Sequence, residues 1–167
     1  MATRSVIARL TAGDDGESYS WEGRYHHWDG YPSGVGVTLI ENLLKHGYQF
    51  MSDRLIDGEA TGWSNINGCD LTLPSAWFDS TKEQVDHVPV SYSARGEGPE
   101  PLRTPGIEDD TEFVYVMHED GYIDVWVRSY ILPTARRLER WSYLGVAHDT
   151  DSMLKLEQLL ISQTAEA

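Results

Sequence analysis

Cysteine is nearly absent from this chain, and so are the long apolar stretches found in membrane proteins. Cys69 is the only cysteine among 167 residues, so neither an intramolecular disulfide nor a cysteine-rich zinc site can form. No apolar run approaches the ~20 residues that cross a bilayer, and the first residues lack the apolar segment of a signal peptide. We therefore expect a protein of a reducing compartment, the cytoplasm.

Positive charge is scarce as well. Lysine and arginine number 13 against 27 aspartates and glutamates, which gives a net charge of −14. Such a chain repels nucleic-acid phosphates on average, and we expect no direct nucleic-acid partner. The acids are scattered and form no block. They can serve solubility alone, or they can imitate nucleic acid and occupy a nucleic-acid-binding protein.

No motif fixes a reaction. The sequence has no G-x-S-x-G serine and no phosphate-binding lysine loop, and Gly34-Val35-Gly36 lacks the third glycine of a dinucleotide fingerprint. It also has no H-E-x-x-H pair and no carboxylate cage, so we expect neither a metal nor a cofactor. Nucleotide-fold enzymes and zinc hydrolases are thereby disfavoured.

Large apolar side chains are plentiful. Hydrophobic residues make up 40% of the chain, with six Trp, nine Tyr and three Phe. A chain of this length buries roughly 70% of its unfolded surface, so it needs no disulfide or structural metal to be stable. We expect one domain over residues 1–167.

Two β-hairpins are predicted. Residues 3–10 and 18–26 alternate in polarity around a Gly-Asp-Asp-Gly turn, and residues 113–117 and 122–127 are β-rich runs around an Asp-Gly turn. In the strand predicted over residues 18–26, successive side chains point to opposite faces of the sheet. One face carries Trp21, Gly23, Tyr25 and His27, and the other carries Ser20, Glu22, Arg24 and His26.

Two helices are predicted. Apolar residues recur at helical spacing over residues 35–46, with Ser33 as N-cap and Gly47 as the glycine that ends the helix. Asp151 can cap a second helix. Together with an extended pattern over residues 136–147, the elements favour an α+β fold: a mainly antiparallel sheet built from hairpins, with about two helices packed on one face. The apolar stripe of the second helix comprises Met153, Leu156, Leu159 and Leu160.

Two segments give weaker signals. Residues 48–92 show little periodicity and are broken by glycine and proline, so no element is assigned there. Residues 93–112 are rich in glycine, proline and acids, with almost no large apolar side chain. We expect an exposed, mobile loop, of a length that is either functional or disordered.

The candidate site is the junction between the first hairpin and the first helix. It concentrates titratable, aromatic and glycine residues, and N–H groups after Ser33 could accept an anion. His26 or His27 could act as general base with Asp29 as orienter, and a ligand's base could stack on Trp28 or Tyr31. The expected ligand-binding residues are Arg4, Arg24, Trp28, Asp29, Tyr31, Ser33 and Gly34.

A purely structural interpretation of the same residues stays open. Asp-Gly-Tyr-Pro is good turn chemistry, and Ser33 and Gly34 can serve capping and close packing alone. Arg4 and Arg24, which we expect to face each other across the first hairpin, can supply phosphate donors or bond acidic neighbours such as Glu22.

The start of the chain resembles a group of small uncharacterised proteins from bacteria and their phages. The resemblance rests on Thr3-Arg4-Ser5, the run His27-Trp28-Asp29-Gly30-Tyr31-Pro32 and the helix that follows, roughly the first 45 residues. It implies a phage or mobile-element accessory protein and assigns no activity. In those relatives a cysteine often precedes the motif, where this chain has His26.

Three functions follow as hypotheses. The first is a noncatalytic binder of a small anionic, nucleotide-like ligand or of a protein partner at the junction. The second is a hydrolase of a phosphoester or nucleotide that uses His26 or His27 with Asp29. The third is an acidic mimic that inhibits a nucleic-acid-binding protein through its surface.

Overall fold

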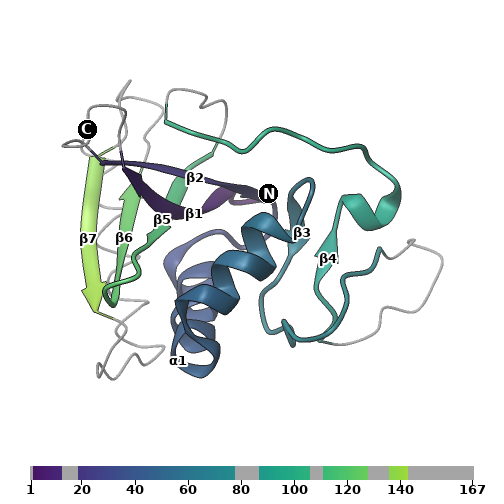
Figure 1. Ribbon diagram of the computed structural model, residues 1–167, viewed down its shortest axis with the longest axis horizontal. Helices are drawn as coiled ribbons and strands as arrows, with labels where there is room; N and C mark the ends of the chain where they lie inside the picture. The colour runs from purple at the N-terminus through teal and green to yellow at the C-terminus, as the bar shows by residue number, and fades with distance from the viewer. Residues whose placement is uncertain (1, 13–18, 78–86, 106–110, 128–135, 143–167) are drawn as a thin grey trace.

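The structure is a computed structural model, and it describes residues 2–12, 19–77, 87–105, 111–127 and 136–142. One sheet of seven strands runs through it in the order β4-β3-β2-β1-β5-β6-β7 (Figure 1). The strands are β1 (Ser5–Ala12), β2 (Tyr19–His26), β3 (Trp63–Asn65), β4 (Val90–Ser91), β5 (Phe113–Met117), β6 (Tyr122–Val127) and β7 (Arg136–Ser142).

Both predicted hairpins are confirmed. β1 and β2 pair antiparallel, with Ser5 opposite His26 and Ala12 opposite Tyr19. β5 and β6 pair antiparallel with Met117 opposite Ile123, and the predicted bounds of both strands agree with the structure. The extended pattern after Pro133 is also a strand, β7, which pairs with β6.

The sheet is mixed, and the expectation of a mainly antiparallel sheet is wrong in this respect. β1 lies parallel to β5, and β2 lies parallel to β3 through His26 and Trp63. The two hairpins therefore join through their first strands, which run in the same direction. The α+β class itself is confirmed, since strands and helix occupy separate stretches of chain.

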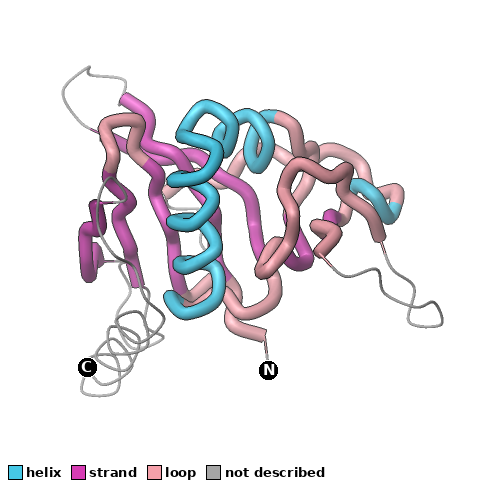
Figure 2. Tube along the Cα trace, turned by 90° about the horizontal axis from the view of Figure 1, so that it is seen from below, coloured by secondary structure: helices cyan, strands magenta, loops and turns pink. Residues whose placement is uncertain are grey.

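A single kinked helical segment covers one face of the described sheet (Figure 2). It consists of the π-helical turn η1 (Pro32–Gly36), α1 (Val37–Ser52) and the π-helical turn η2 (Asp53–Asp57). Gly47 has φ 85° and ψ 166°, so it kinks the segment and does not end it as predicted. The second expected helix, from Asp151, lies outside the described residues.

The segment also begins earlier than predicted. Tyr31 occupies the N-cap position without a side-chain cap, and Pro32 is the first residue of the turn. Proline is favoured at this position because its missing N–H would have no helical partner there. Ser33 is therefore inside the helical segment and is not its N-cap.

The core lies between the sheet and this helical segment. Alternation along β1 and β5 sends Ile7, Tyr115 and Met117 toward the helix, where they pack among buried residues of α1 such as Leu39 and Leu43. The even-numbered residues form a second cluster on the opposite face of the sheet. That cluster contains Val6, Ala8, Val114 and Val116, with Leu10, Trp21 and Trp126 packed against it.

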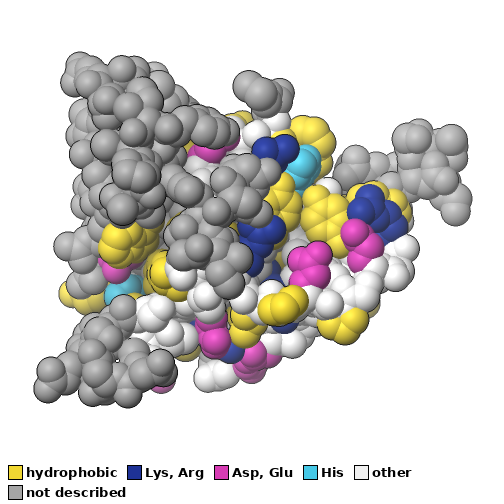
Figure 3. Space-filling view, turned by 90° about the horizontal axis from the view of Figure 1, so that it is seen from above, with side chains coloured by type: hydrophobic (Ala, Val, Ile, Leu, Met, Phe, Trp, Pro, Cys, Tyr) yellow, Lys and Arg dark blue, Asp and Glu magenta, His cyan; other side chains and the backbone are white. Residues whose placement is uncertain are grey.

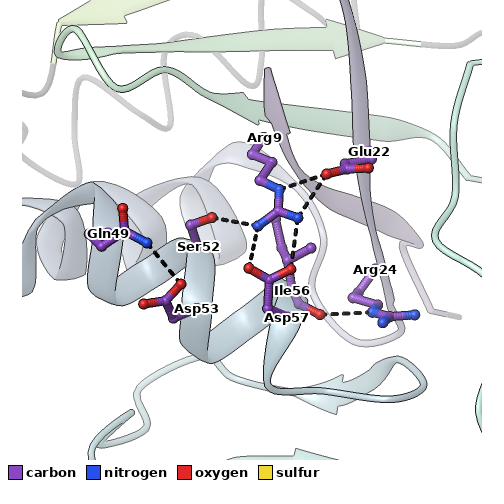
Figure 4. A network of polar contacts seen from close by, with 8 residues as sticks. All are labelled: Arg9, Glu22, Arg24, Gln49, Ser52, Asp53, Ile56 and Asp57. Carbon is purple, nitrogen blue, oxygen red and sulfur yellow. Dashed lines mark hydrogen bonds and ion pairs between the residues drawn. The ribbon is translucent and has the colours of Figure 1, made fainter. Parts of the chain in front are cut away.

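An arginine joins the first hairpin to the end of the helical segment (Figure 4). Arg9 donates two hydrogen bonds to the Asp57 carboxylate, each 2.7 Å long, and others to Ser52 and Glu22. The hydrogen bond from Arg9 lowers the pKa of Asp57. Because Arg9 is partly buried and its fork is fully used, the network holds η2 against the β1–β2 hairpin.

We expect Arg9→Lys to lower the free energy of unfolding by about 1–2 kcal/mol, because lysine keeps the charge and loses the planar fork. Urea denaturation measures the change. Asp53→Asn is the matched control, because the side chain of Asp53 accepts an exposed hydrogen bond from Gln49 and lies in the same turn as Asp57. Equal stability of Arg9→Lys and the wild type would show that the network contributes charge alone.

The connection after β4 returns to β2, on the same edge that pairs with β3 through His26. It begins with the 3-10 turn η3 (Ser93–Arg95), and residues 94–101 are exposed. Gly23 and Arg103 then exchange two backbone hydrogen bonds of 2.9 Å, and Glu100 donates to the Ala60 carbonyl. The mobility expected for residues 93–112 stays a prediction, and 106–110 lie outside the described residues.

The described helices include none long and apolar enough to span a membrane. The cytoplasmic location expected from composition stays a prediction.

Candidate functional site

The junction between β2 and the helical segment is a tight turn whose N–H groups are used internally. Gly34 donates to the Tyr31 carbonyl, and Val35 donates to the Asp29 carbonyl. Asp29 has φ 51°, which is uncommon for a residue with a side chain. A Cβ on Gly34 would collide with the Asp29 carbonyl oxygen, so glycine is required for the turn to close. The N–H donors expected to hold an anion are therefore committed to the turn.

The side chains of the turn also pair with one another. The Tyr31 hydroxyl donates to Asp29 Oδ1 at 2.8 Å. Asn67 donates to the carbonyls of Trp28 and Asp29 from the neighbouring segment. These contacts favour the structural interpretation for Asp29, Tyr31 and Gly34.

His26 is fully buried on the helix side of the sheet. Its Nε2 accepts a 3.0 Å hydrogen bond from the Ile66 N–H. Burial, with a smaller contribution from His27, lowers the pKa of His26 to about 3. A residue so placed cannot act as a base on a surface ligand, and it serves instead to join β2 to the segment after β3.

His27 points to the other face, as the period of two predicts. Its Nδ1 lies 2.7 Å from the Tyr25 hydroxyl, and its ring meets the edge of Trp28 at 4.7 Å between centroids. The structure thus pairs His27 with Tyr25, and Asp29 with Tyr31. These pairings give the hydrolase hypothesis no histidine oriented by Asp29.

Tyr25 extends this pair of rings into a longer row. Its ring stacks against Tyr92 at 6.4 Å, and Tyr92 in turn lies 5.8 Å from Trp77. At the other end of the row, the side chain of Trp28 is 47% exposed. Rings from β2, from the residue after β4 and from residue 77 therefore form one contiguous aromatic surface.

Two arginines lie over this row. The Arg95 guanidinium is 4.3 Å from the Trp77 ring centroid and 5.2 Å from that of Tyr92. Arg103 is 4.7 Å from the Tyr25 centroid. At these distances a guanidinium is attracted to the ring face and is held in a defined position. The rings thus help to orient these two cations.

A third arginine is close by. Burial raises the pKa of Tyr92, and the charges of Arg95 and Arg4 oppose that shift. Arg4 precedes β1 and by alternation belongs to the same face as Val6 and Tyr25. We call this set the aromatic–arginine surface: Tyr25, His27, Trp28, Trp77, Tyr92, Arg4, Arg95 and Arg103.

The aromatic–arginine surface lies on the face of the sheet away from α1. Figure 3 views that face and shows Arg and Lys, His and hydrophobic side chains together on its described part. Acidic side chains are present too, and Glu97 forms a 2.8 Å ion pair with Arg95. In a chain of net charge −14, such a grouping of cations is a local exception.

Arg24 lies elsewhere, and the expected pairing of Arg4 with Arg24 is wrong. The β1–β2 register places Arg24 opposite Ile7 on the helix side. Its guanidinium donates to the carbonyls of Ile56 and Glu100 (Figure 4 shows the first). Arg24 therefore supports the connection between β2 and η2.

The sequence did not predict a second pair of polar side chains, which a histidine and an aspartate form. His118 Nε2 and Asp124 Oδ2 are 2.8 Å apart, and both residues are buried. They flank the Asp-Gly turn of the β5–β6 hairpin, where the register makes them diagonal neighbours on one face. The signal was present in the predicted hairpin, since a six-residue separation across this turn brings the two side chains together.

Metal binding and thiol chemistry have little support in the described part of the chain. No group of three histidine, cysteine, aspartate or glutamate side chains within the described ranges is placed to hold a metal ion. Burial raises the pKa of the Cys69 thiol to about 11, so its reactive thiolate is scarce near neutral pH.

Comparison with protein-family models, with curated proteins and with solved structures finds no match to this chain. Its function is therefore inferred from the geometry of its own residues.

Proposed function

We propose that this protein is a noncatalytic binder of an anionic, nucleotide-like ligand, and that the ligand binds to the aromatic–arginine surface. The observation that carries the proposal is the position of Arg95 over Trp77 and Tyr92, and of Arg103 over Tyr25. Guanidinium groups are good phosphate donors, and rings accept planar bases. The surface offers both within one row.

The position of Trp28 supports the same ligand. Its side chain is the most exposed large hydrophobic group in the described residues, at 47%. Its neighbour His27 fixes one edge of the ring. An exposed indole held this way is a platform on which a base can stack at a low entropic cost.

The proposed site contains some of the residues predicted from the sequence, but it is centred on the ring row and not on the turn at Asp29. Arg4 and Trp28 remain ligand-binding residues, and His27 joins them as part of the ring row. Asp29, Tyr31 and Gly34 are assigned to the turn that follows Trp28, since their contacts close that turn, and Ser33 is assigned to the helical turn η1. Arg24 and His26 are assigned to the helix side.

Titration of tryptophan fluorescence with thymidine monophosphate tests the proposal. Trp28→Ala should weaken binding by about fivefold or more, because stacking on an aromatic side chain contributes ~1–3 kcal/mol per base. Because Trp28 is itself a reporter, calorimetry gives the affinity of this variant. Leu44→Ala is the matched control, since Leu44 is 44% exposed on α1.

Arg103→Gln provides the second arm of the same test. It removes the cation over Tyr25, which is nearer to Trp28 along the ring row than Arg95 is, and should also weaken nucleotide binding. If Trp28→Ala and Arg103→Gln both remained folded by circular dichroism and bound the nucleotide as the wild type does, the aromatic–arginine surface would not be the binding site.

A further inference from the structure

The cations of the aromatic–arginine surface are separated from one another. Arg103 lies over Tyr25, and Arg95 lies over Trp77 and Tyr92. The Tyr25 and Tyr92 centroids are 6.4 Å apart, so the two guanidinium groups lie over different rings of the row. Cations distributed along a row suit anionic groups that are repeated along an extended ligand.

We infer that the natural ligand is a single strand of nucleic acid, an inference that rests on the function proposed above. Phosphates in a stacked strand recur about every 3.4 Å along its axis. A strand that follows the ring row therefore brings successive phosphates to Arg103 and Arg95. A mononucleotide reaches only one of them.

The overall charge selects a single strand over a duplex. A chain of net charge −14 repels polyanions everywhere except at a local cluster of cations. A duplex carries a second row of phosphates, which would meet acidic surface beside the cluster. Its paired bases would also be closed to stacking on Trp28, whose ring is the exposed end of the row. The expectation of no nucleic-acid partner, based on average charge, does not take account of this local surface.

The Glu97 carboxylate competes with a phosphate of the strand for Arg95. The carboxylate is 2.8 Å from the Arg95 guanidinium, and both side chains are less than half exposed. A phosphate at Arg95 must displace this carboxylate or share the cation with it. Glu97→Gln should therefore strengthen binding of a strand severalfold, which is the opposite of what loss of a contact residue would do.

The test measures binding of thymidylates of one, four and eight nucleotides by calorimetry at several salt concentrations. The eight-nucleotide strand should bind at least tenfold more tightly than the mononucleotide. Two or three phosphate contacts predict a slope of log K against log salt of roughly −1.5 to −2. An eight-base-pair duplex should bind more weakly than the strand.

Variants link the slope to individual cations. Arg103→Gln should reduce the magnitude of the salt slope by about 0.7, the value for one contact on a single strand. Lys45→Gln removes an exposed charge on α1 and should leave the slope unchanged. Circular dichroism confirms that each variant is folded.

The outcomes separate the two proposals. Affinity that rises with length and falls with Arg103→Gln supports the single-strand inference. Mononucleotide binding that depends on Trp28, with no gain from length or with tighter binding of the duplex, overturns the inference and leaves the proposed function in place. Absence of binding to every probe overturns both.

Discussion

Gly23→Ala should destabilise the fold by about 3 kcal/mol or more. A Cβ at Gly23 would collide with the Ile7 carbonyl oxygen and would lie 2.7 Å from Ala8 Cα, and both atoms belong to the backbone of β1. The other edge of Gly23 is bonded to Arg103. If β2 moved away from β1, it would lose hydrogen bonds to β1 and press against the backbone at Arg103, so the collision cannot be relieved locally.

Urea denaturation of Gly23→Ala and Gly98→Ala isolates this effect. Gly98 has no atom within 4 Å of the position a Cβ would take, and its backbone is not left-handed. Its alanine variant should therefore have nearly wild-type stability. Equal stability of the two variants would contradict the close approach of β1 and β2 described above.

Acidification should produce the second large effect, through His26. The pKa of His26 is about 3 in the folded protein, and an unfolded histidine titrates near 6.5. Below pH 6.5 the unfolded chain therefore binds a proton that the folded chain does not. Stability falls as the pH decreases through this window, by about 2.5 kcal/mol between pH 6.5 and 4.5.

Carboxylates whose charged form is stabilised by a partner do not titrate between pH 6.5 and 4.5. Asp57 has a lowered pKa because Arg9 donates to it, and its stabilising contribution is lost only as the pH falls below about 4. Protonation of His26 also removes the lone pair that accepts the Ile66 N–H. Acid should therefore loosen the contact between β2 and the segment after β3.

Chemical denaturation at pH 6.5 and 4.5 measures the effect in three proteins. His26→Gln does not titrate and keeps an acceptor for Ile66, so the loss of stability between these pH values should be about 2.5 kcal/mol smaller than in the wild type. His87→Gln, at an exposed histidine, should behave as the wild type. A wild-type pH dependence in His26→Gln would show that His26 is not the group responsible.

Local patterns in the sequence predicted the hairpins because their determinants are local. The β-rich runs over residues 113–117 and 122–127 and the Asp-Gly turn between them determine both strands and their pairing. The period of two along β2 placed Tyr25 and His27 on one face of this strand, and Arg24 and His26 on the other. These residue positions needed no knowledge of the rest of the fold.

The parallel pairings could not be predicted, because the strands that they join are far apart in the sequence. β1 meets β5 across more than a hundred residues, and β2 meets β3 through a single register position. Neither pairing leaves a turn or a spacing that the sequence displays. The helix boundary was missed because Pro32 begins the segment after Tyr31, whereas the prediction placed the N-cap two positions later at Ser33, a common N-cap residue.

The candidate site was predicted only at its β2 end. His27 and Trp28 belong to a short stretch whose chemistry is visible in the sequence, and Arg4 lies in the first strand of the predicted hairpin. Trp77 and Tyr92 come from a region without periodicity, and they reach Tyr25 only because β4 pairs with β3, which in turn pairs with β2. A surface built from several distant segments requires the fold before it can be recognised.

The central claim is that the aromatic–arginine surface binds the ligand, and tryptophan indole N–H signals in a ¹H–¹⁵N NMR titration test it most directly. An eight-nucleotide thymidylate should shift the signals of Trp28 and Trp77, which lie at the two ends of the ring row. The signal of Trp63, which is buried and donates to the Leu55 carbonyl, should stay in place. Unchanged Trp28 and Trp77 signals at saturating strand would contradict the claim.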